Sequence, residues 1–330
     1  MNIVGIGGGT GLPTLLRGLK TLRQLGECDV KITALVAVSD SGGSSGQLRR
    51  ALGIPAMGDI RNCFIALGDS HAVLKALSQH RFESVDGLVG HSAGNLMLTG
   101  LYQMAGNFPG MVRLASQLFQ LQDTILPATD VPVTLCAEYI DGSTAREESS
   151  IPLKRTPIRR LWVDPESPLP APMVLDALAE AGIIVLGPGS LFTSILPNLL
   201  VAGIAKAIHD SAALKVYVCN LMTEAGETEG YTAKDHLYTL LSYLPAGSID
   251  VCVVNSRSAS PMLTQKYMAS GATLVGRTPG DIEALGVSVR SADLLEECDG
   301  KVRHDQLALA RLIVSLAQQK REQEALCAES

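Results

Sequence analysis

The first residues of the chain lead into a glycine-rich loop whose composition suits phosphate binding. The hydrophobic stretch Ile3–Ile6 is followed by Gly7, Gly8, Gly9, Thr10 and Gly11, and a helical pattern starts directly afterwards. Glycine accepts positive φ and lets N–H groups approach an anion, while a helix N-terminus adds unpaired N–H groups. A plain strand-to-helix turn is the alternative, but one or two glycines suffice for it. We therefore interpret residues 7–11 as a phosphate-binding loop.

This loop matches neither of the common nucleotide-binding fingerprints. In the pattern G-x-G-x-x-G, the third glycine would fall on Thr10 if counted from Gly5 and on Leu12 if counted from Gly7. A Walker A loop ends on a lysine, and the first lysine of the chain is Lys20. No acidic residue closes a strand about twenty residues later, where a dinucleotide ribose would need it. The sequence predicts a phosphate loop of another type, and an NAD-dependent oxidoreductase is the weakest reading.

A second loop, Ser39–Gly46, combines backbone donors, hydroxyl groups and one carboxylate. Its first half contains Asp40, Ser41, Gly42 and Gly43. Successive N–H groups bind anions, and a carboxylate suits a hard cation such as Mg²⁺. A flexible linker is the alternative, although a linker would not follow a strand with its only charge at Asp40. We expect this loop to bind a phosphate together with a cation.

The segment Gly187–Ser194 repeats the design of the N-terminal loop, because a strand leads into Gly187, Gly189 and Ser190 and then into a helix. A turn around Pro188 would also need two glycines, so the structural reading stays open. Two phosphate-binding loops in one chain would suit a diphosphate or two phosphorylated ligands.

A polar loop follows the next predicted strand and suits the recognition of sugar hydroxyl groups. This loop, Asn220–Thr232, contains Asn220, Thr223, Glu224 and Glu227, whose side chains would contact ribose or another sugar. Thr232 is expected to cap the helix that starts at Ala233, which makes His236 a structural residue.

Two further motifs open helices and have both a structural and a functional reading. In Gly58–Asn62, Asp59 would bind a metal ion or accept a proton and Arg61 would hold a phosphate, but Asp59 equally suits a helix cap. In His91–Asn95, Ser92 would cap a helix and Asn95 either faces the cleft or is a buried amide. No Ser–His–acid grouping and no zinc motif can be argued from spacing, so a nucleophilic hydrolase is unsupported.

Five short aliphatic segments would position these loops as parallel strands. They are Asn2–Gly7, Lys31–Ser39, Ile183–Gly187, Lys215–Asn220 and Asp250–Asn255. Each runs into a loop of small or polar residues and then into a helical pattern, which is typical of a doubly wound α/β domain. Because ligands bind outside the carboxyl ends of such strands, the loops should converge on one cleft.

The middle of the chain departs from this alternation. Residues 46–121 are helical in pattern, with a helix over Ser92–Ala105, and we interpret them as a helical insertion. Residues 124–164 are rich in β-forming residues around the turn signal Asp141-Gly142, and we interpret them as an antiparallel β insertion on the main sheet. A long amphipathic helix is predicted near the C-terminus, over Asp305–Ala325.

Composition limits the classes of function. With 330 residues, 46% of them hydrophobic, the chain can bury one large α/β core, and its formal net charge of −6 argues against sequence-independent nucleic-acid binding. Seven scattered cysteines without a C-x-x-C pair indicate a reducing compartment. The most apolar segment, residues 182–205, is broken by glycine and proline. We expect a cytoplasmic protein without a membrane span, and its apolar content favours a homodimer.

Six motifs taken together resemble the CofD-like family, and in particular its YvcK-type branch, the gluconeogenesis factors. They are Gly7–Gly11, Ser39–Gly46, Gly58–Asn62, His91–Asn95, Gly187–Ser190 and Asn220–Thr228. The resemblance covers nearly the whole chain, so residues 1–330 are interpreted as one Rossmann-like α/β domain.

The resemblance implies two functions, and both require a nucleotide diphosphate in the cleft. The YvcK branch implies a non-catalytic binder of UDP-sugars such as UDP-N-acetylglucosamine, linked to growth on gluconeogenic carbon sources and to cell shape, with no required cofactor and with a protein partner that reads the bound state. The enzymatic relatives imply an Mg²⁺-dependent 2-phospho-L-lactate transferase, in which Asp40 and Asp59 would hold the metal or assist deprotonation of the acceptor. By the same resemblance, Tyr267 would stack on a base and Arg303 would neutralise a diphosphate.

Departures from the transferase pattern favour the binding function. Where the transferases read Gly-Gly-Thr-Gly-Gly, this chain continues with Leu12 and Pro13, and where they read Ser-Asp-Asn it has Ser41 as the third residue. Aromatic residues make up only 4% of the chain, which is few for a broad deazaflavin pocket. The transferase is therefore the second of the two interpretations.

Overall fold

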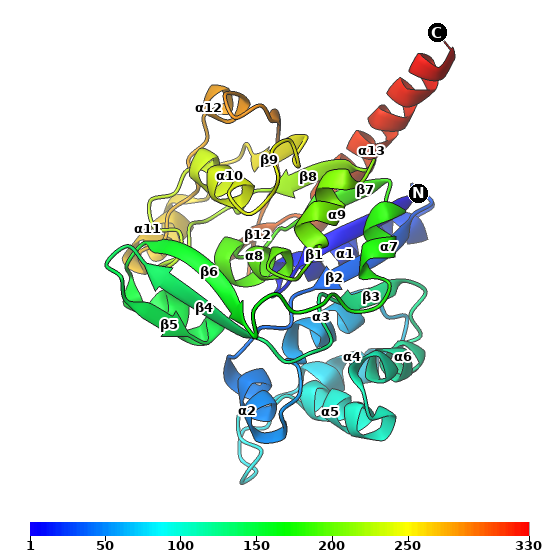
Figure 1. Ribbon diagram of the computed structural model, residues 1–330, viewed down its shortest axis with the longest axis vertical. Helices are drawn as coiled ribbons and strands as arrows, with labels where there is room; N and C mark the ends of the chain where they lie inside the picture. The colour runs from blue at the N-terminus through cyan, green and yellow to red at the C-terminus, as the bar shows by residue number, and fades with distance from the viewer. Residues whose placement is uncertain (330) are drawn as a thin grey trace.

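The computed structural model describes residues 1–329, which form a doubly wound α/β fold around one seven-stranded sheet (Figure 1). The strand order is β10-β9-β8-β7-β1-β2-β3, and every pairing in it is parallel. The strands are β1 (Asn2–Gly7), β2 (Lys31–Val36), β3 (Thr124–Pro127), β7 (Ile183–Leu186), β8 (Leu214–Val218), β9 (Val251–Asn255) and β10 (Ser288–Ala292). The predicted fold class is confirmed, and all five predicted strands are present.

The strand order reverses between β7, the central strand of the sheet, and its neighbour β1. From β1 the chain proceeds through β2 to β3 in one direction, and from β7 it proceeds through β8 and β9 to β10 in the other. Right-handed crossovers in opposite directions place their helices on opposite faces of the sheet. The loops that follow β1 and β7 therefore meet at the switch point, where this class of fold binds ligands.

Helices cover both faces of the sheet (Figure 1). On one face α1 (Gly11–Gln24) packs against α3 (Gly58–Leu67) and α13 (Gln306–Glu329). On the other face lie α7 (Val174–Ala179), the π-helix η2 (Leu191–Ile195), α8 (Leu196–Leu199), α9 (Ile204–Asp210) and α10 (Ala233–Leu241). Every residue of β7 is apolar and buried, because helices cover both faces of this strand.

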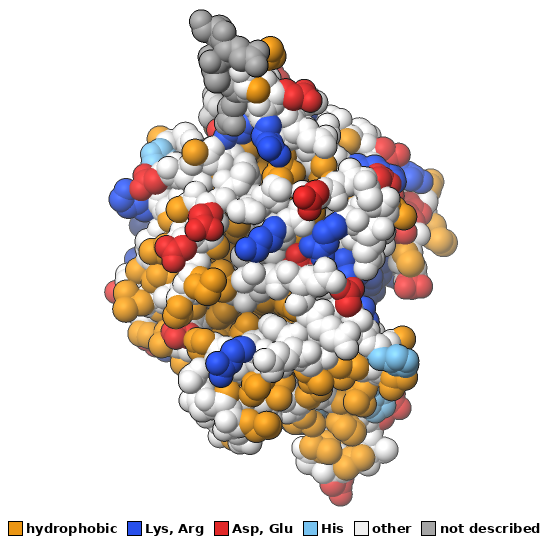
Figure 2. Space-filling view, turned by 90° about the vertical axis from the view of Figure 1, so that its right-hand side faces the viewer, with side chains coloured by type: hydrophobic (Ala, Val, Ile, Leu, Met, Phe, Trp, Pro, Cys, Tyr) orange, Lys and Arg blue, Asp and Glu red, His pale blue; other side chains and the backbone are white. Residues whose placement is uncertain are grey.

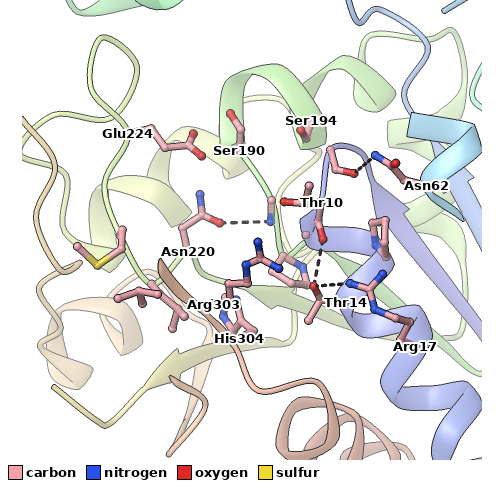
Figure 3. A pocket seen from close by; sticks show the side chains of 18 of the residues that line it. Thr10, Thr14, Arg17, Asn62, Ser190, Ser194, Asn220, Glu224, Arg303 and His304 are labelled. Carbon is pink, nitrogen blue, oxygen red and sulfur yellow. Dashed lines mark hydrogen bonds between the residues drawn. The ribbon is translucent and has the colours of Figure 1, made fainter. Parts of the chain in front are cut away.

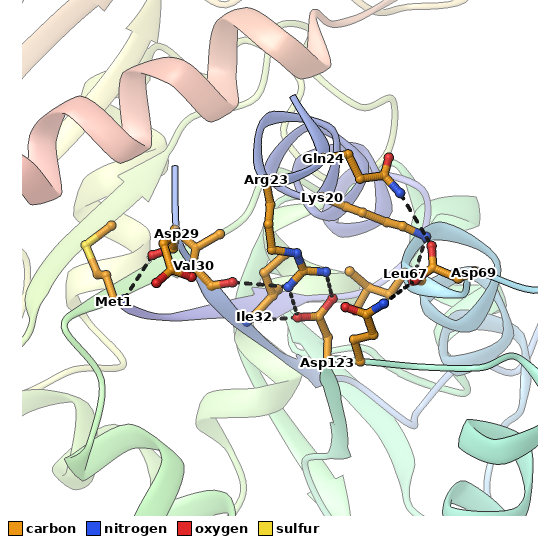
Figure 4. Close-up of polar contacts among 11 residues, drawn as sticks. Met1, Lys20, Arg23, Gln24, Asp29, Val30, Ile32, Leu67, Asp69 and Asp123 are labelled. Carbon is orange, nitrogen blue, oxygen red and sulfur yellow. Dashed lines mark hydrogen bonds and ion pairs between the residues drawn. The ribbon is translucent and has the colours of Figure 1, made fainter. Parts of the chain in front are cut away.

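Two ion-pair networks attach α1 to its neighbours (Figure 4). Arg23 forms a fork with Asp123 at 2.6 and 2.7 Å, and the same carboxylate accepts a hydrogen bond from the Ile32 N–H group. Lys20 donates to the carbonyl oxygens at the end of α3 and pairs with Asp69 at 2.7 Å. The contacts of Asp123 fix the start of β3 beside β2, and those of Lys20 hold the end of α3 against α1.

The segment predicted as an antiparallel insertion over residues 124–164 divides into two parts. Its first part, β3, belongs to the parallel sheet, so the prediction is wrong there. The physical reason is that Ile125 and Leu126 are buried and Asp123 anchors the strand to β2, a long-range pairing that local sequence does not reveal. The second part is antiparallel, in the order β5 (Thr144–Arg146), β4 (Thr134–Tyr139), β6 (Ile158–Asp164), and carries the 3₁₀ helix η1 (Glu148–Lys154).

Residues 43–118 contain the helices α2 (Gly43–Leu52), α3, α4 (Ala72–Gln79), α5 (Ala93–Ala105) and α6 (Phe108–Leu118). The predicted cap of α5 is present, because the Ser92 hydroxyl accepts a hydrogen bond from the Asn95 N–H group at 3.2 Å. Hydrophobic side chains gather on the surface over this part of the molecule (Figure 2). Val73, Leu77 and Met104 are among those exposed on α4 and α5.

The C-terminal part contains elements that the sequence did not indicate. These are α11 (Pro261–Ala269), α12 (Pro279–Glu283), the strand β10 and a hairpin of β11 (Leu295–Cys298) and β12 (Lys301–His304). The predicted terminal helix is present as α13, and its end projects from the body of the molecule (Figure 1). Within residues 1–329 no single helix meets the length and hydropathy of a membrane span; only the bent pair Leu191–Leu199 and Ile204–Asp210, at 79°, meets them jointly.

Candidate functional site

The two glycine loops lie against each other at the switch point. A Cβ atom on Gly11 would lie only 2.3 Å from the carbonyl oxygen of Pro188, and 2.8 Å from the Cα of Gly189. Gly189 has φ +148°, and a Cβ on Gly187, with φ +87°, would lie 2.9 Å from the Val218 carbonyl oxygen. Glycine is therefore required at these positions for the loops to approach, whatever they bind.

A cavity of about 630 Å³ opens between these loops and the C-terminal hairpin (Figure 3). Ten of the residues predicted to bind ligand line it: Gly9, Thr10, Gly11, Gly189, Ser190, Asn220, Thr223, Glu224, Tyr267 and Arg303. They come from the three loops that follow β1, β7 and β8, and from α11 and β12. The structure thus brings together residues as distant in sequence as Gly9 and Arg303.

A second cavity of about 330 Å³ adjoins the first and contains the predicted carboxylates. Gly9, Thr10, Asn62 and Ser194 line both cavities, so the two form one continuous site. Predicted site residues in the second cavity are Asp40, Gly42, Gly43, Asp59 and Asn95. Arg61, Arg81 and Glu148 also line it.

Five predicted ligand-binding residues line neither of these cavities and instead support the loops: Gly7, Gly8, Ser41, Gly187 and Glu227. The Gly7 carbonyl oxygen accepts a hydrogen bond from the Ala37 N–H group, and a Cβ on Gly8 would lie 2.5 Å from the Asp59 carboxylate. The Ser41 hydroxyl accepts from the Ser149 N–H group at 3.0 Å, which attaches this loop to η1.

Asp59 lies beneath the N-terminal glycine loop. Its carboxylate accepts a hydrogen bond from the Gly9 N–H group, so this donor of the loop is already engaged within the protein. Burial first, and then the charge of Asp40, raise the pKa of Asp59 to about 7, although the Gly9 hydrogen bond opposes the shift. Asp59 is in the first turn of α3, whose N-cap is Met57, so the alternative of a helix-cap residue does not hold.

Glu148, in η1, is a third carboxylate of the second cavity and was not predicted. Burial and the charge of Asp40 raise its pKa to about 7, while a hydrogen bond from the Ser41 N–H group opposes the shift. The Asp40 carboxylate itself accepts from the Gly42 N–H group at 2.8 Å. Within residues 1–329 no set of three His, Cys, Asp or Glu side chains has a geometry that could hold a metal ion by itself.

Two more carboxyl groups converge on Ser190 at the border of the first cavity. Glu227 accepts a hydrogen bond from the Ser190 hydroxyl at 2.6 Å, and burial and the neighbouring Glu224 raise its pKa to about 7. Burial also raises the pKa of Glu224, which lines the cavity. The Oε2 atom of Glu224 is buried without a hydrogen-bond partner, so a ligand hydroxyl group could supply one.

Arg61 in α3 is held by polar side chains rather than by an acid. Its guanidinium donates to the Ser92 hydroxyl at 2.6 Å, to the Asn95 amide oxygen at 2.8 Å and to the Asn62 amide oxygen at 2.9 Å. Asn95 is 1% exposed and also donates to Ser45, so its amide is committed to positioning Arg61 and α2. Of the two roles considered for Asn95 from the sequence, a cleft-facing residue and a buried amide, the structure shows the buried amide.

The walls of the first cavity are fixed by hydrogen bonds. The Tyr267 hydroxyl accepts from the Val302 N–H group at 3.1 Å and so joins α11 to the hairpin strand that carries Arg303. The Asn220 amide oxygen accepts from the Gly189 N–H group at 3.3 Å (Figure 3). His236, predicted to be structural, is 0% exposed and its Nδ1 atom contacts the Thr232 carbonyl oxygen.

A family model, curated relatives and a solved structure are all similar to this chain over nearly its whole length. The family described as "2-phospho-L-lactate transferase CofD" matches residues 3–295. A "Gluconeogenesis factor" of Halalkalibacterium halodurans is 42% identical over 313 residues, which are 95% of each chain. A protein of the same name from Bacillus subtilis is 42% identical over 310 residues, which are 94% of this chain and 96% of that protein. The crystal structure of a Bacillus halodurans protein, 43% identical, superposes with a TM-score of 0.91 over 95% of this chain and 99% of that chain.

Proposed function

The chain belongs to the CofD family, and we propose that it is a cytoplasmic regulator that binds a nucleotide-diphosphate sugar such as UDP-N-acetylglucosamine. The proposal assigns the phosphates to Gly9–Gly11 and to Gly189 and Ser190, with Asp40, Gly42 and Gly43 completing this rim. Asn220, Thr223 and Glu224 contact the sugar or ribose, and Tyr267 and Arg303 hold the nucleotide. The relatives named gluconeogenesis factor support the assignment to the binding branch.

The observation that carries the proposal is the composition of the first cavity. Its volume of about 630 Å³ is within the range of ligand sites, roughly 300 to 1,000 Å³. The start of α1 at Gly11 and the guanidinium of Arg303 suit a diphosphate, the polar groups of Asn220 and Glu224 suit sugar hydroxyls, and the Tyr267 ring suits a base.

We extend the proposal to physiology in line with the names of the relatives. The bound sugar nucleotide would report the supply of cell-wall precursors, and a protein partner or the second copy of a homodimer would read the bound state. Growth on gluconeogenic carbon sources and cell shape would then depend on this chain. A strain whose own gene is replaced by an Arg303→Met variant should show the defects of a deletion strain.

Calorimetric titration tests the binding proposal. The purified chain is titrated with UDP-N-acetylglucosamine, UDP-glucose, GDP and NAD, each with and without Mg²⁺. We expect saturable binding of a UDP-sugar and weaker or absent binding of GDP and NAD. Tight binding of GDP with no response to either UDP-sugar would overturn the proposal.

The second cavity supports the transferase as a second candidate. Mg²⁺ keeps several waters and takes one or two protein carboxylates together with substrate phosphates, and Asp40 and Asp59 fit that donor set. Mg²⁺ would neutralise phosphate charge there, and whichever of the two carboxylates does not bind the metal would accept the proton of an acceptor hydroxyl group. In a deazaflavin phospholactyl-transfer assay, Asp40→Asn should reduce turnover more than binding; an unchanged rate would dismiss the role of Asp40.

A further inference from the structure

Arg17 and Arg303 form a pair of cations at one end of the first cavity. Arg17 comes from α1 and Arg303 from β12, and both side chains extend toward Thr14 (Figure 3). Both arginines also line an adjoining cavity of about 760 Å³, so the pair lies at the border between this cavity and the first one. Arg303 is exposed and Arg17 is half-buried.

Within the residues that the structure describes, neither guanidinium forms an ion pair, although Glu296 lies opposite Arg303 in the hairpin and lines the adjoining cavity together with both arginines. The recorded side-chain hydrogen bond of Arg17 is a long one, 3.4 Å to the Thr14 hydroxyl. Burial, and next the charge of Arg303, lower the pKa of Arg17 from its ordinary value. The two groups therefore repel each other at a partly desolvated place, which costs free energy unless an anion joins them.

Arg23 shows what a structural arginine looks like on the same helix. Its guanidinium forms a fork with the buried carboxylate of Asp123 at 2.6 and 2.7 Å and also donates to the Val30 carbonyl oxygen. Arg17 has no comparable partner, although it lies only six residues earlier. This contrast favours a ligand, rather than the fold, as the missing partner of Arg17.

The position of Arg17 on α1 connects it to the glycine loop. Gly11, Thr14 and Arg17 are spaced by three residues, so they share one face of the helix, and all three line the first cavity. Helical side chains point toward the helix N-terminus, which directs the Arg17 guanidinium back toward Thr14 and the loop. A phosphate bound at the loop would thus have the two arginines beside it.

We propose that Arg17 and Arg303 together clamp one phosphate group of the nucleotide diphosphate, with Arg17 as a ligand-binding residue. The inference rests on the proposed function, because that function supplies the diphosphate. Each guanidinium presents a planar set of N–H donors that matches phosphate oxygens, and the anion removes the repulsion between the two cations. Arg17 would therefore contribute to affinity for the diphosphate and not to the folding of the free protein.

The test compares Arg17→Met, Arg17→Lys and the control Arg113→Met, an exposed arginine on α6 outside both cavities. Pyrophosphate and UDP-N-acetylglucosamine are titrated calorimetrically, and the unfolding temperature is measured without ligand. We expect Arg17→Met to weaken both ligands about ten- to hundredfold, Arg17→Lys to weaken them less, and the control to leave them unchanged. The unfolding temperature of ligand-free Arg17→Met should equal or exceed that of the wild type, because the repulsion is gone.

Three results would overturn the clamp: wild-type affinity in Arg17→Met, an equal loss in Arg113→Met, or a lower unfolding temperature of ligand-free Arg17→Met, which would mark a structural role. Failure of the clamp and failure of the proposed function are distinguishable. Arg17-dependent binding of pyrophosphate with no binding of UDP-sugars would support the clamp and refute the sugar nucleotide. If UDP-N-acetylglucosamine binds equally well to the wild type and to Arg17→Met, the proposed function is supported and the clamp is refuted. If neither pyrophosphate nor UDP-N-acetylglucosamine binds, both proposals are refuted.

Discussion

Replacing Asp59 by asparagine should stabilise the protein at alkaline pH, although the residue lies in the centre of the candidate site. The Asp59 carboxyl group is buried under Gly8 and Gly9 and stands in the field of Asp40. Asparagine has the same shape, lacks the charge, and keeps an oxygen that can accept the hydrogen bond from the Gly9 N–H group. The substitution therefore isolates the cost of a buried charge.

The magnitude follows from the shift of the pKa. In the folded protein the pKa of Asp59 rises from 3.8 to about 7, which is about three units, and each unit corresponds to about 1.4 kcal/mol. Because the folded pKa lies above the unfolded one, the folded state binds more protons between pH 4 and pH 7, and the free energy of unfolding falls as the pH rises through this window. At pH 8 Asp59→Asn should exceed the wild type by about 4 kcal/mol at most, and below pH 4 the difference should vanish.

Urea denaturation at pH 4, 5, 6, 7 and 8 would measure this difference. Asp86→Asn, in the exposed loop between α4 and α5, is the matched control for the loss of one carboxylate and should not gain the stability expected of Asp59→Asn. An Asp59→Asn variant that is no more stable than the wild type at pH 8, or whose advantage does not grow with pH, would refute the reasoning about burial and about the charge of Asp40.

Three further predictions concern the walls of the site. Gly11→Ala should lower the free energy of unfolding by about 1–3 kcal/mol, because the new Cβ would lie 2.3 Å from the Pro188 carbonyl oxygen; Gly100→Ala in α5, where nothing lies within 4 Å of a Cβ, should instead be neutral or stabilising in the same thermal unfolding measurement. Tyr267→Phe should lose about 1–3 kcal/mol of stability in urea denaturation, because the Val302 N–H group loses its acceptor. If the ring stacks on the base, the affinity for UDP-N-acetylglucosamine should be kept in Tyr267→Phe and should fall in Tyr267→Ala. Burial lowers the pKa of His304 from 6.5 to about 4, so between pH 6.5 and pH 4 the folded state binds fewer protons than the unfolded state, and the free energy of unfolding falls as the pH falls. Relative to His304→Gln, the wild type should lose about 3 kcal/mol of stability between pH 6.5 and pH 4 in urea denaturation. Parallel plots of stability against pH for the two proteins would contradict this.

Much of the architecture could be predicted from local sequence, because the strands that position the site are buried on both faces. Such strands are continuous apolar runs, and the glycines that end β1 and β7 mark the loops at the switch point. The edge strand β10 has no such signal, since its residues are exposed or half-buried. The strand β3 was assigned to the wrong sheet because its partner lies about ninety residues earlier in the chain.

The site itself was predictable where loops follow strands and less so elsewhere. The sequence signal for Arg17 is a polar stripe of Thr14, Arg17 and Thr21 on a helix whose other side is buried. Glu148 had none, because it meets Asp40 only when η1 folds back across the sheet edge. Glu227 was predicted to contact ligand, but its carboxylate holds the Ser190 hydroxyl, a pairing that depends on tertiary structure.

A crystal structure of the protein with UDP-N-acetylglucosamine would test the central claim most directly. We predict density for the diphosphate between the Gly9–Gly11 loop, Gly189 and the guanidinium of Arg303, with the sugar or ribose near Asn220 and Glu224. Density for the nucleotide outside the first cavity, or an empty cavity at saturating ligand, would contradict the account.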